Sequence, residues 1–159
     1  MIIEMESIGP KINSDDIKDL ELKLNLKFPE SYKRFLLECN GGEPVERAIN
    51  FKIKGNSFEG DYIASFYEVS DDTSYGINKN MENHGLNIPD KLIYIASTPA
   101  GNYFLLSLQE DSYGNVFYKN HEVEDHLPFA PANNILPESI IKIANTFDEF
   151  LSFLYDPDQ

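Results

Sequence analysis

The sequence has one cysteine, no tryptophan and few positive charges, and these shortages exclude several classes of protein. Cys39 alone cannot form an internal disulfide framework, so we expect a chain that folds in the reducing cytoplasm. No stretch approaches the roughly 18 consecutive apolar residues that a membrane-spanning helix needs. The first residues, MIIEMESIGP, carry acids and lack a basic leader region, so we expect no signal peptide.

Positive charge is scarce mainly in the second part of the chain. The whole chain has 13 Lys and Arg residues against 27 Asp and Glu, a net charge of −14. Residues 1–54 hold 10 acids and 9 bases, whereas residues 55–159 hold 17 acids and 4 bases. Such a surface repels phosphate backbones and anionic membranes, so we expect no direct nucleic-acid or membrane binding. A basic protein is the complementary partner, although acidity also serves solubility alone.

Apolar and aromatic residues, by contrast, are plentiful. Hydrophobic residues make up 42% of the 159 positions, and Phe and Tyr number 11 and 9. A chain of this length and composition buries a substantial core, and no low-complexity linker divides it. We therefore expect one folded domain over residues 1–159.

The stretch FYKNHEVEDH, residues 117–126, looks similar to the HExxH helix of zinc proteases. That motif places two His residues four positions apart, on one helix face, whereas His121 and His126 are five apart. This spacing turns them about 140° from each other on a helix and puts them on opposite faces of a strand. We expect no metal, no cofactor and no catalytic residue here. We interpret His121 as a hydrogen-bonded residue at a strand end, with Glu122 and the acids after it facing solvent or a partner.

Two helices are predicted near the N-terminus. Ser14 is a suitable N-cap for a helix that reaches about Leu24, although the leucines there also alternate as in a strand. Pro29 suits the first turn of a second helix, which ends at residues 40–42, Asn-Gly-Gly. An apolar stripe with helical spacing runs along it, and the cysteine in it is interpreted as a core residue: Tyr32, Phe35, Leu36 and Cys39.

Alternating apolar residues and turn signals predict strands in the middle of the chain. Candidate strands cover INFKI (49–53), DYIASFYEV (61–69), KLIYIAS (91–97), NYFLLSL (102–108) and NVFYKN (115–120). The last three are joined by short turns and predict an antiparallel meander whose middle strand is central. Residues 74–85 are predicted as a weak helix or an ordered loop.

The C-terminal part predicts a short strand followed by a helix. Residues 140–144 resemble a strand, and Thr146 precedes Glu149 by three positions, the spacing of a capping box. The helix that follows has a core-facing stripe at positions i, i+3, i+4 and i+7, namely Phe147, Phe150, Leu151 and Leu154.

Three segments in this order resemble the SUKH superfamily: LKLNLKFPESYKRFLLECNGG, IYIASTPAGNYFLLSLQEDSYGNVFYKNHE and IANTFDEFLSFL. The resemblance runs from about Ile12 to Leu154. It implies an α+β fold, a mainly antiparallel sheet with an N-terminal helix pair and a C-terminal helix packed against it. Bacterial members of this superfamily resemble immunity proteins, so the resemblance implies a binding protein that neutralises a toxin domain, often a nuclease, without enzymatic activity.

Two other functions stay open from the sequence. A hydrolase could use paired carboxylates, although no motif singles out a pair, and an intracellular regulatory domain could bind a protein other than a toxin. For a basic toxin partner, we expect contacts from exposed acids on loops and strand ends. These candidate residues are Glu59, Asp61, Asp71, Asp72, Glu110, Asp111, Glu122, Glu124 and Asp125.

Overall fold

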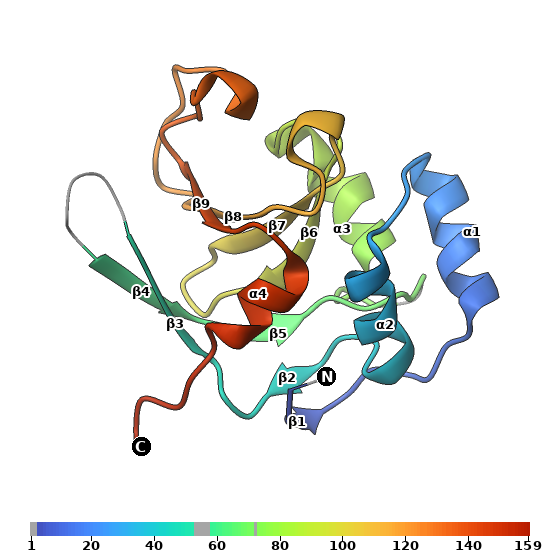
Figure 1. Cartoon of the computed structure of the whole chain (residues 1–159). Helices are drawn as coiled ribbons and strands as arrows, with labels where there is room; N and C mark the ends of the chain where they lie inside the picture. Colours follow the sequence, from blue (N-terminus) through green and yellow to red (C-terminus); the bar gives the residue numbers. More distant parts are fainter. Residues whose placement is uncertain (1–2, 53–57, 72) are drawn as a thin grey trace.

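The computed structural model describes residues 3–52, 58–71 and 73–159, and Figure 1 shows the arrangement of its elements. The expected α+β fold is confirmed. The α-helices of the described residues are α1 (Ser14–Leu24), α2 (Glu30–Glu38), α3 (Ile77–His84) and α4 (Phe147–Ser152). Short 3-10 helices are η1 (Gly85–Asn87), η2 (Glu110–Ser112) and η3 (Pro131–Asn133). No helix in these ranges is long and apolar enough to cross a membrane.

The strands form one large antiparallel sheet and two small two-stranded ones. The five-stranded sheet has the order β5 (Ser65–Phe66), β6 (Leu92–Ser97), β7 (Tyr103–Ser107), β8 (Val116–Lys119) and β9 (Ile140–Ala144). The predicted meander is thus confirmed, and β7 is its central strand. The smaller sheets pair β1 (Met5–Ser7) with β2 (Glu43–Pro44), and β3 (Ala48–Lys52) with β4 (Phe58–Tyr62).

Both faces of the five-stranded sheet are covered. On one face Phe104 contacts Phe150 of α4, with ring centroids 5.1 Å apart. In Figure 1, α2 and α4 lie together on this side of the sheet. On the other face Phe117 contacts Phe129, at 5.2 Å, and the Tyr94 hydroxyl donates to the carbonyl of His84 at the end of α3. The rows of apolar residues on β6 to β8 are buried because each face has its own cover.

The start of α1 differs from the prediction by one residue. Asn13, not Ser14, is the N-cap: its side chain accepts from the backbone N–H of Asp16, and the Asp16 carboxylate accepts from the N–H of Asn13. Asn and Ser cap equally well, but only Asn13 stands three residues before an acid that can return the bond. The helix ends at Leu24, as predicted.

The loop after α2 requires glycine. The backbone has positive φ at Asn40 (44°), Gly41 (85°) and Gly42 (102°), as the Asn-Gly-Gly sequence predicts. A Cβ on Gly42 would lie 2.1 Å from the carbonyl oxygen of Ser7, so β1 can approach only a glycine here. Cys39, at the end of the helix, is buried in the core, as predicted.

The segment predicted as a single strand over residues 61–69 is divided between two sheets, so this prediction was wrong. Its start belongs to β4, and its later part contains β5. At the division, the N–H of Ile63 donates to Arg47 beside the hairpin, whereas that of Ala64 donates to Ser97 of the large sheet. The backbone changes its pairing partner there, which an alternating sequence does not reveal. Residue 53, the end of the predicted strand 49–53, lies outside the described residues.

The other predicted helices are present, with one change at the cap of α4. The Thr146 side chain accepts from the N–H of Glu149 (3.0 Å), as predicted. The Glu149 carboxylate, however, accepts from the N–H of Asn145 rather than of Thr146. Phe147, Phe150 and Leu151 of this helix are buried in the core as predicted, whereas Leu154 is buried but lies two residues beyond the end of the helix. The weak helical pattern at 74–85 corresponds to α3.

Candidate partner-binding site

The His-Glu pair lies in a turn directly after β8. The strand ends at Lys119, and the N–H of Asn120 then donates to the carbonyl of Ser139. The Asn120 side chain in turn accepts from the N–H of Glu122, at 3.0 Å. In a continued strand, the side chains of His121 and Glu122 would lie on opposite faces. The turn replaces the strand here, and both residues are exposed.

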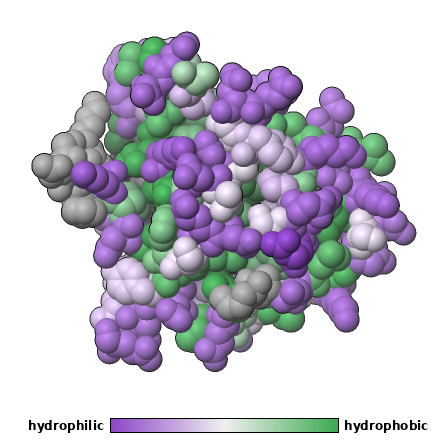
Figure 2. Space-filling model, viewed as in Figure 1, coloured by the Kyte–Doolittle hydropathy of each residue, from purple (hydrophilic) through white to green (hydrophobic). Residues whose placement is uncertain are grey.

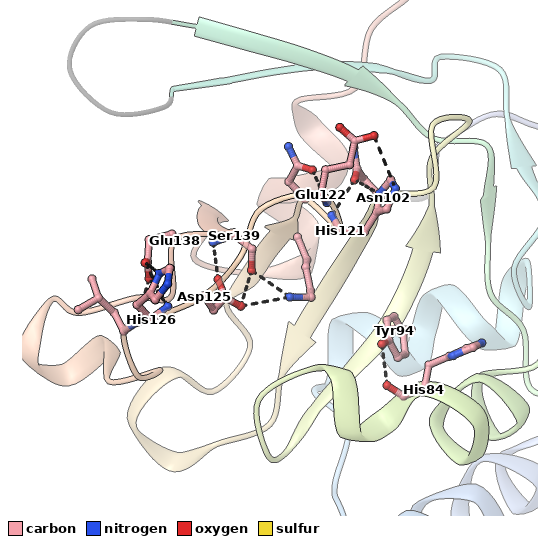
Figure 3. Close-up of polar contacts among 12 residues, drawn as sticks. His84, Tyr94, Asn102, His121, Glu122, Asp125, His126, Glu138 and Ser139 are labelled. Atoms are coloured by element: carbon pink, nitrogen blue, oxygen red, sulfur yellow. Dashed lines mark hydrogen bonds and ion pairs between the residues drawn. The ribbon is translucent and has the colours of Figure 1, made fainter.

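Asn102, in the turn between β6 and β7, fixes His121 (Figure 3). Its Oδ1 accepts from the backbone N–H of His121 (2.9 Å) and lies 2.7 Å from Nδ1 of the ring. Because Nδ2 of Asn102 donates to the Tyr118 hydroxyl (2.7 Å), Oδ1 must accept, and Nδ1 of His121 carries a proton. The Tyr118 hydroxyl donates onward to Asp61 of β4 (2.6 Å). This confirms His121 as a hydrogen-bonded residue at a strand end and joins the turn to the β3–β4 hairpin.

Asp125 holds together the two ends of the connection between β8 and β9. Its carboxylate accepts from the N–H of Ser139 (2.7 Å) and from the Ser139 hydroxyl (2.8 Å), and Lys119 Nζ lies 3.4 Å away. Partial burial raises the pKa of Asp125, but these hydrogen bonds and the Lys119 charge outweigh it and lower the pKa. The carboxylate is therefore engaged within the fold rather than free for a partner.

Glu138 organises the middle of the same connection. Its carboxylate accepts from the backbone N–H groups of His126 and Leu127, both at 2.9 Å, and lies 2.8 Å from His126 Nδ1 (Figure 3). The two backbone hydrogen bonds, with a smaller contribution from the ring, lower the pKa of Glu138 to about 2. His121 and His126 thus have different partners, Asn102 and Glu138.

A groove of about 770 Å³ runs beside β9, between the β3–β4 hairpin and the connection of residues 120–139. We call it the β9 groove. Its lining is mostly apolar, and the side chains of Leu127 and Ile135 are exposed by 52% and 37%. Figure 2 shows apolar surface between the hairpin and the segment at the top of the view. Its charged lining residues are Lys52, Glu59, Glu138 and Lys142.

Five of the predicted contact residues lie around this groove and the turn before it. Glu59 lines the groove, and Glu122 and Glu124 flank Val123, which also lines it. Glu122 and Glu124 are exposed by 79% and 87%. Asp61 and Asp125 are close to them in the fold, but their carboxylates accept hydrogen bonds from Tyr118 and Ser139. Of these five, Glu59, Glu122 and Glu124 have carboxylates that accept no hydrogen bond from the described residues.

Three of the remaining predicted residues lie away from the groove. Asp71 forms an ion pair with Lys23 of α1, at 3.1 Å. Glu110 and Asp111 are exposed on η2, where Glu110 borders a separate cavity beside α1. Asp72 lies outside the described residues. Asp71, Glu110 and Asp111 therefore do not form one site with the β9 groove.

The sequence interpretation did not include the apolar part of the groove. Leu127 and Ile135 belong to HLPFAPANNILPES, which has neither helical nor strand periodicity. The available signal was the presence of large apolar residues in a proline-rich connection with no element to bury them. Glu138 was missed because its hydrogen bonds to backbone N–H groups depend on the loop's conformation.

A comparison with known families agrees with the fold and with the succession of the three sequence segments. The model of the SMI1 / KNR4 family (SUKH-1) matches residues 11–152. The chain belongs to this family. It is also 23% identical, over 162 aligned residues, to the SPbeta prophage-derived uncharacterized protein YokK of Bacillus subtilis (strain 168). That alignment covers 92% of this chain and 77% of YokK.

Proposed function

We propose that this SUKH-1 protein is an immunity protein that binds a cognate bacterial toxin domain and neutralises it by occlusion. Membership of the SUKH-1 family supports a binding role. The partner we propose is a basic domain of the nuclease type. The protein itself acts by binding and performs no reaction.

The observation that carries this proposal is the arrangement of the His-Glu turn. The side chains of Asn120 and Asn102 accept hydrogen bonds from the backbone N–H groups of Glu122 and His121 and so fix the turn, while the side chain of Glu122 is 79% exposed. A nuclease binds phosphate with clustered Lys and Arg side chains. Carboxylates presented on a rigid support can occupy such a cluster without a large loss of conformational entropy.

Co-expression tests the proposal. The toxin to test is the basic C-terminal domain of a large exported protein, if one is encoded next to this gene. We expect its expression to stop growth and this chain to restore growth. Failure to restore growth contradicts immunity and favours a regulatory binding role.

Matched variants connect the effect to the turn. The double variant Glu122→Gln/Glu124→Gln removes two exposed charges, and we expect it to weaken toxin binding at least about tenfold, mainly through slower association at low salt. Asp19→Asn, on the exposed side of α1, is the control and should bind as the wild type does. Asp125 is left unchanged in this test because its carboxylate holds the connection together.

A further inference from the structure

We propose that the partner inserts an extended segment into the β9 groove, where it pairs with the outer edge of β9 as a sixth strand. This proposal rests on the proposed function only in that the chain binds a protein. It goes further by assigning the surface, the mode of binding and the chemistry of the bound segment.

The two edges of the five-stranded sheet differ. At the β5 edge, the backbone of Phe66 pairs with Gly42 through two hydrogen bonds, of 2.8 and 3.2 Å, so this edge is covered. At the other edge, β9 pairs with β8, and no other strand of the described residues pairs with it. An edge strand presents alternate N–H and C=O groups outward, and these groups can bind an added strand.

The β9 groove provides contacts for side chains as well as for backbone. Ile141 of β9 pairs with Tyr118 of β8, so the two side chains lie on the same face of the sheet, and both line the groove. Leu127 and Ile135, from the connection, line it too. Because side chains alternate along a strand, an added strand would bury every second side chain against these apolar groups.

A second copy of the chain does not suit this edge. Lys142 is exposed in the middle of β9, and a symmetric antiparallel pair centred there would place the two lysines opposite each other. The partner is therefore a different protein.

The exposed acids indicate the charge of that segment. Among the described residues, Glu122 and Glu124 contact only the rings of His121 (3.9 Å) and His126 (4.0 Å), and none of the three acids pairs with Lys or Arg. Glu59 lines the groove, and Glu122 and Glu124 flank the lining residue Val123, so these three acids outnumber the two lysines that line it, Lys52 and Lys142. The chemistry that fits is an extended segment with alternating apolar and basic residues.

A synthetic strand tests this surface without the natural partner. The probe is a capped peptide of about nine residues with alternating lysine and valine, titrated into the isotope-labelled full chain. We expect amide chemical-shift changes at Ile140–Ala144, Leu127 and Ile135, and none at the covered β5 edge. Methylation of the peptide nitrogens at every second residue removes main-chain donors, and we expect it to weaken binding at least about tenfold.

Two variants and a matched control locate the site. Leu127→Asp and Ile135→Asp add charge at exposed positions that the fold tolerates, and each should weaken peptide binding at least about tenfold. Leu22→Asp makes the same change on α1, at a leucine exposed by 74%, and should bind normally. Circular dichroism should show the spectrum of the wild type for all three variants, which checks that they are folded.

Three results would overturn the proposal: shifts spread over the whole acidic surface, equal binding of the methylated peptide, or equal binding of a glutamate–valine peptide. The growth assay separates this proposal from immunity. Peptide binding at β9 without rescue of growth supports the strand site and contradicts immunity. Full rescue by Leu127→Asp and by Ile135→Asp supports immunity and contradicts the β9 groove as the toxin site.

Discussion

The hydroxyl of Tyr118 donates a hydrogen bond of 2.6 Å to the carboxylate of Asp61, 57 positions earlier in the chain. The ring of Tyr118 also lies 4.5 Å from that of Phe51, between ring centroids. Burial, and then the Asp61 carboxylate, raise the pKa of Tyr118 well above its usual value, so the hydroxyl stays a donor. One side chain thus attaches the β3–β4 hairpin to the large sheet.

Tyr118→Phe removes this attachment. The change deletes the bond to Asp61 and leaves the Asn102 amide without an acceptor, so we expect a loss of about 1–2 kcal/mol in unfolding free energy. Urea denaturation followed by circular dichroism measures it. Tyr62→Phe, on the same hairpin and 46% exposed, is the control and should change stability by less than about 0.5 kcal/mol. Equal effects would show that the hydroxyl contributes nothing specific.

The connection of residues 120–139 should loosen in acid. The pKa of Glu138 is lowered from 4.5 to about 2, so its stabilising effect is present above about pH 4.5 and is lost as the pH falls towards 2. Asp125, whose pKa is also lowered, adds a loss of the same sign. We expect the difference in urea midpoint between wild type and Glu138→Gln to shrink over this range. A constant difference would contradict the role of the charge.

Replacing glycine by alanine should have opposite effects at Gly42, after α2, and at Gly85, after α3. Gly42→Ala places a Cβ against the carbonyl of Ser7 at a φ of 102°, so we expect a loss of at least about 2 kcal/mol. Gly85→Ala is at a φ of −60° with only the end of Met81 nearby, and we expect a neutral or slightly stabilising effect. Thermal unfolding measures both. Similar melting temperatures would show that β1 can move away from the loop.

The buried carboxylate of Glu21 should also matter for stability. It is 4% exposed and accepts a 2.7 Å hydrogen bond from the N–H of Phe28, which joins α1 to the segment before α2. Glu21→Ala leaves this buried donor unpaired, and we expect a cost of about 1–3 kcal/mol. Glu21→Gln keeps an acceptor and should cost less, and Asp19→Ala on the exposed side of α1 should cost least. Chemical denaturation of the three variants checks this order.

Most of the fold could be predicted from the sequence, because local patterns determine most elements. The stripe of α2, the alternation in β6 to β8 and the capping residue Thr146 each point to one structure. The division of residues 61–69 between two sheets could not be predicted, because apolar and polar residues alternate in the same way along a strand of either sheet. Which partner the backbone takes at Ile63 and Ala64 depends on contacts with distant residues.

The candidate site was predicted only in part. Charge and position in the sequence identify Glu122 and Glu124, which the structure exposes. The same reasoning also selects Asp125, whose carboxylate is used by Ser139. Net charge does not show which carboxylates accept hydrogen bonds from loop residues within the fold. The apolar groove depends on three separate segments, so no local pattern contains it.

The hairpin beside the β9 groove is closed at its base by the C-terminal segment. The backbones of Ala48 and Tyr155 exchange two hydrogen bonds, each of 3.0 Å. During synthesis, Ala48 leaves the ribosome long before Tyr155 does, so this contact is among the last to form. The β9 strand also comes late in the chain. A nascent chain therefore lacks the finished groove until the segment through Tyr155 has left the ribosome, and the strand site that we propose can form only after that point.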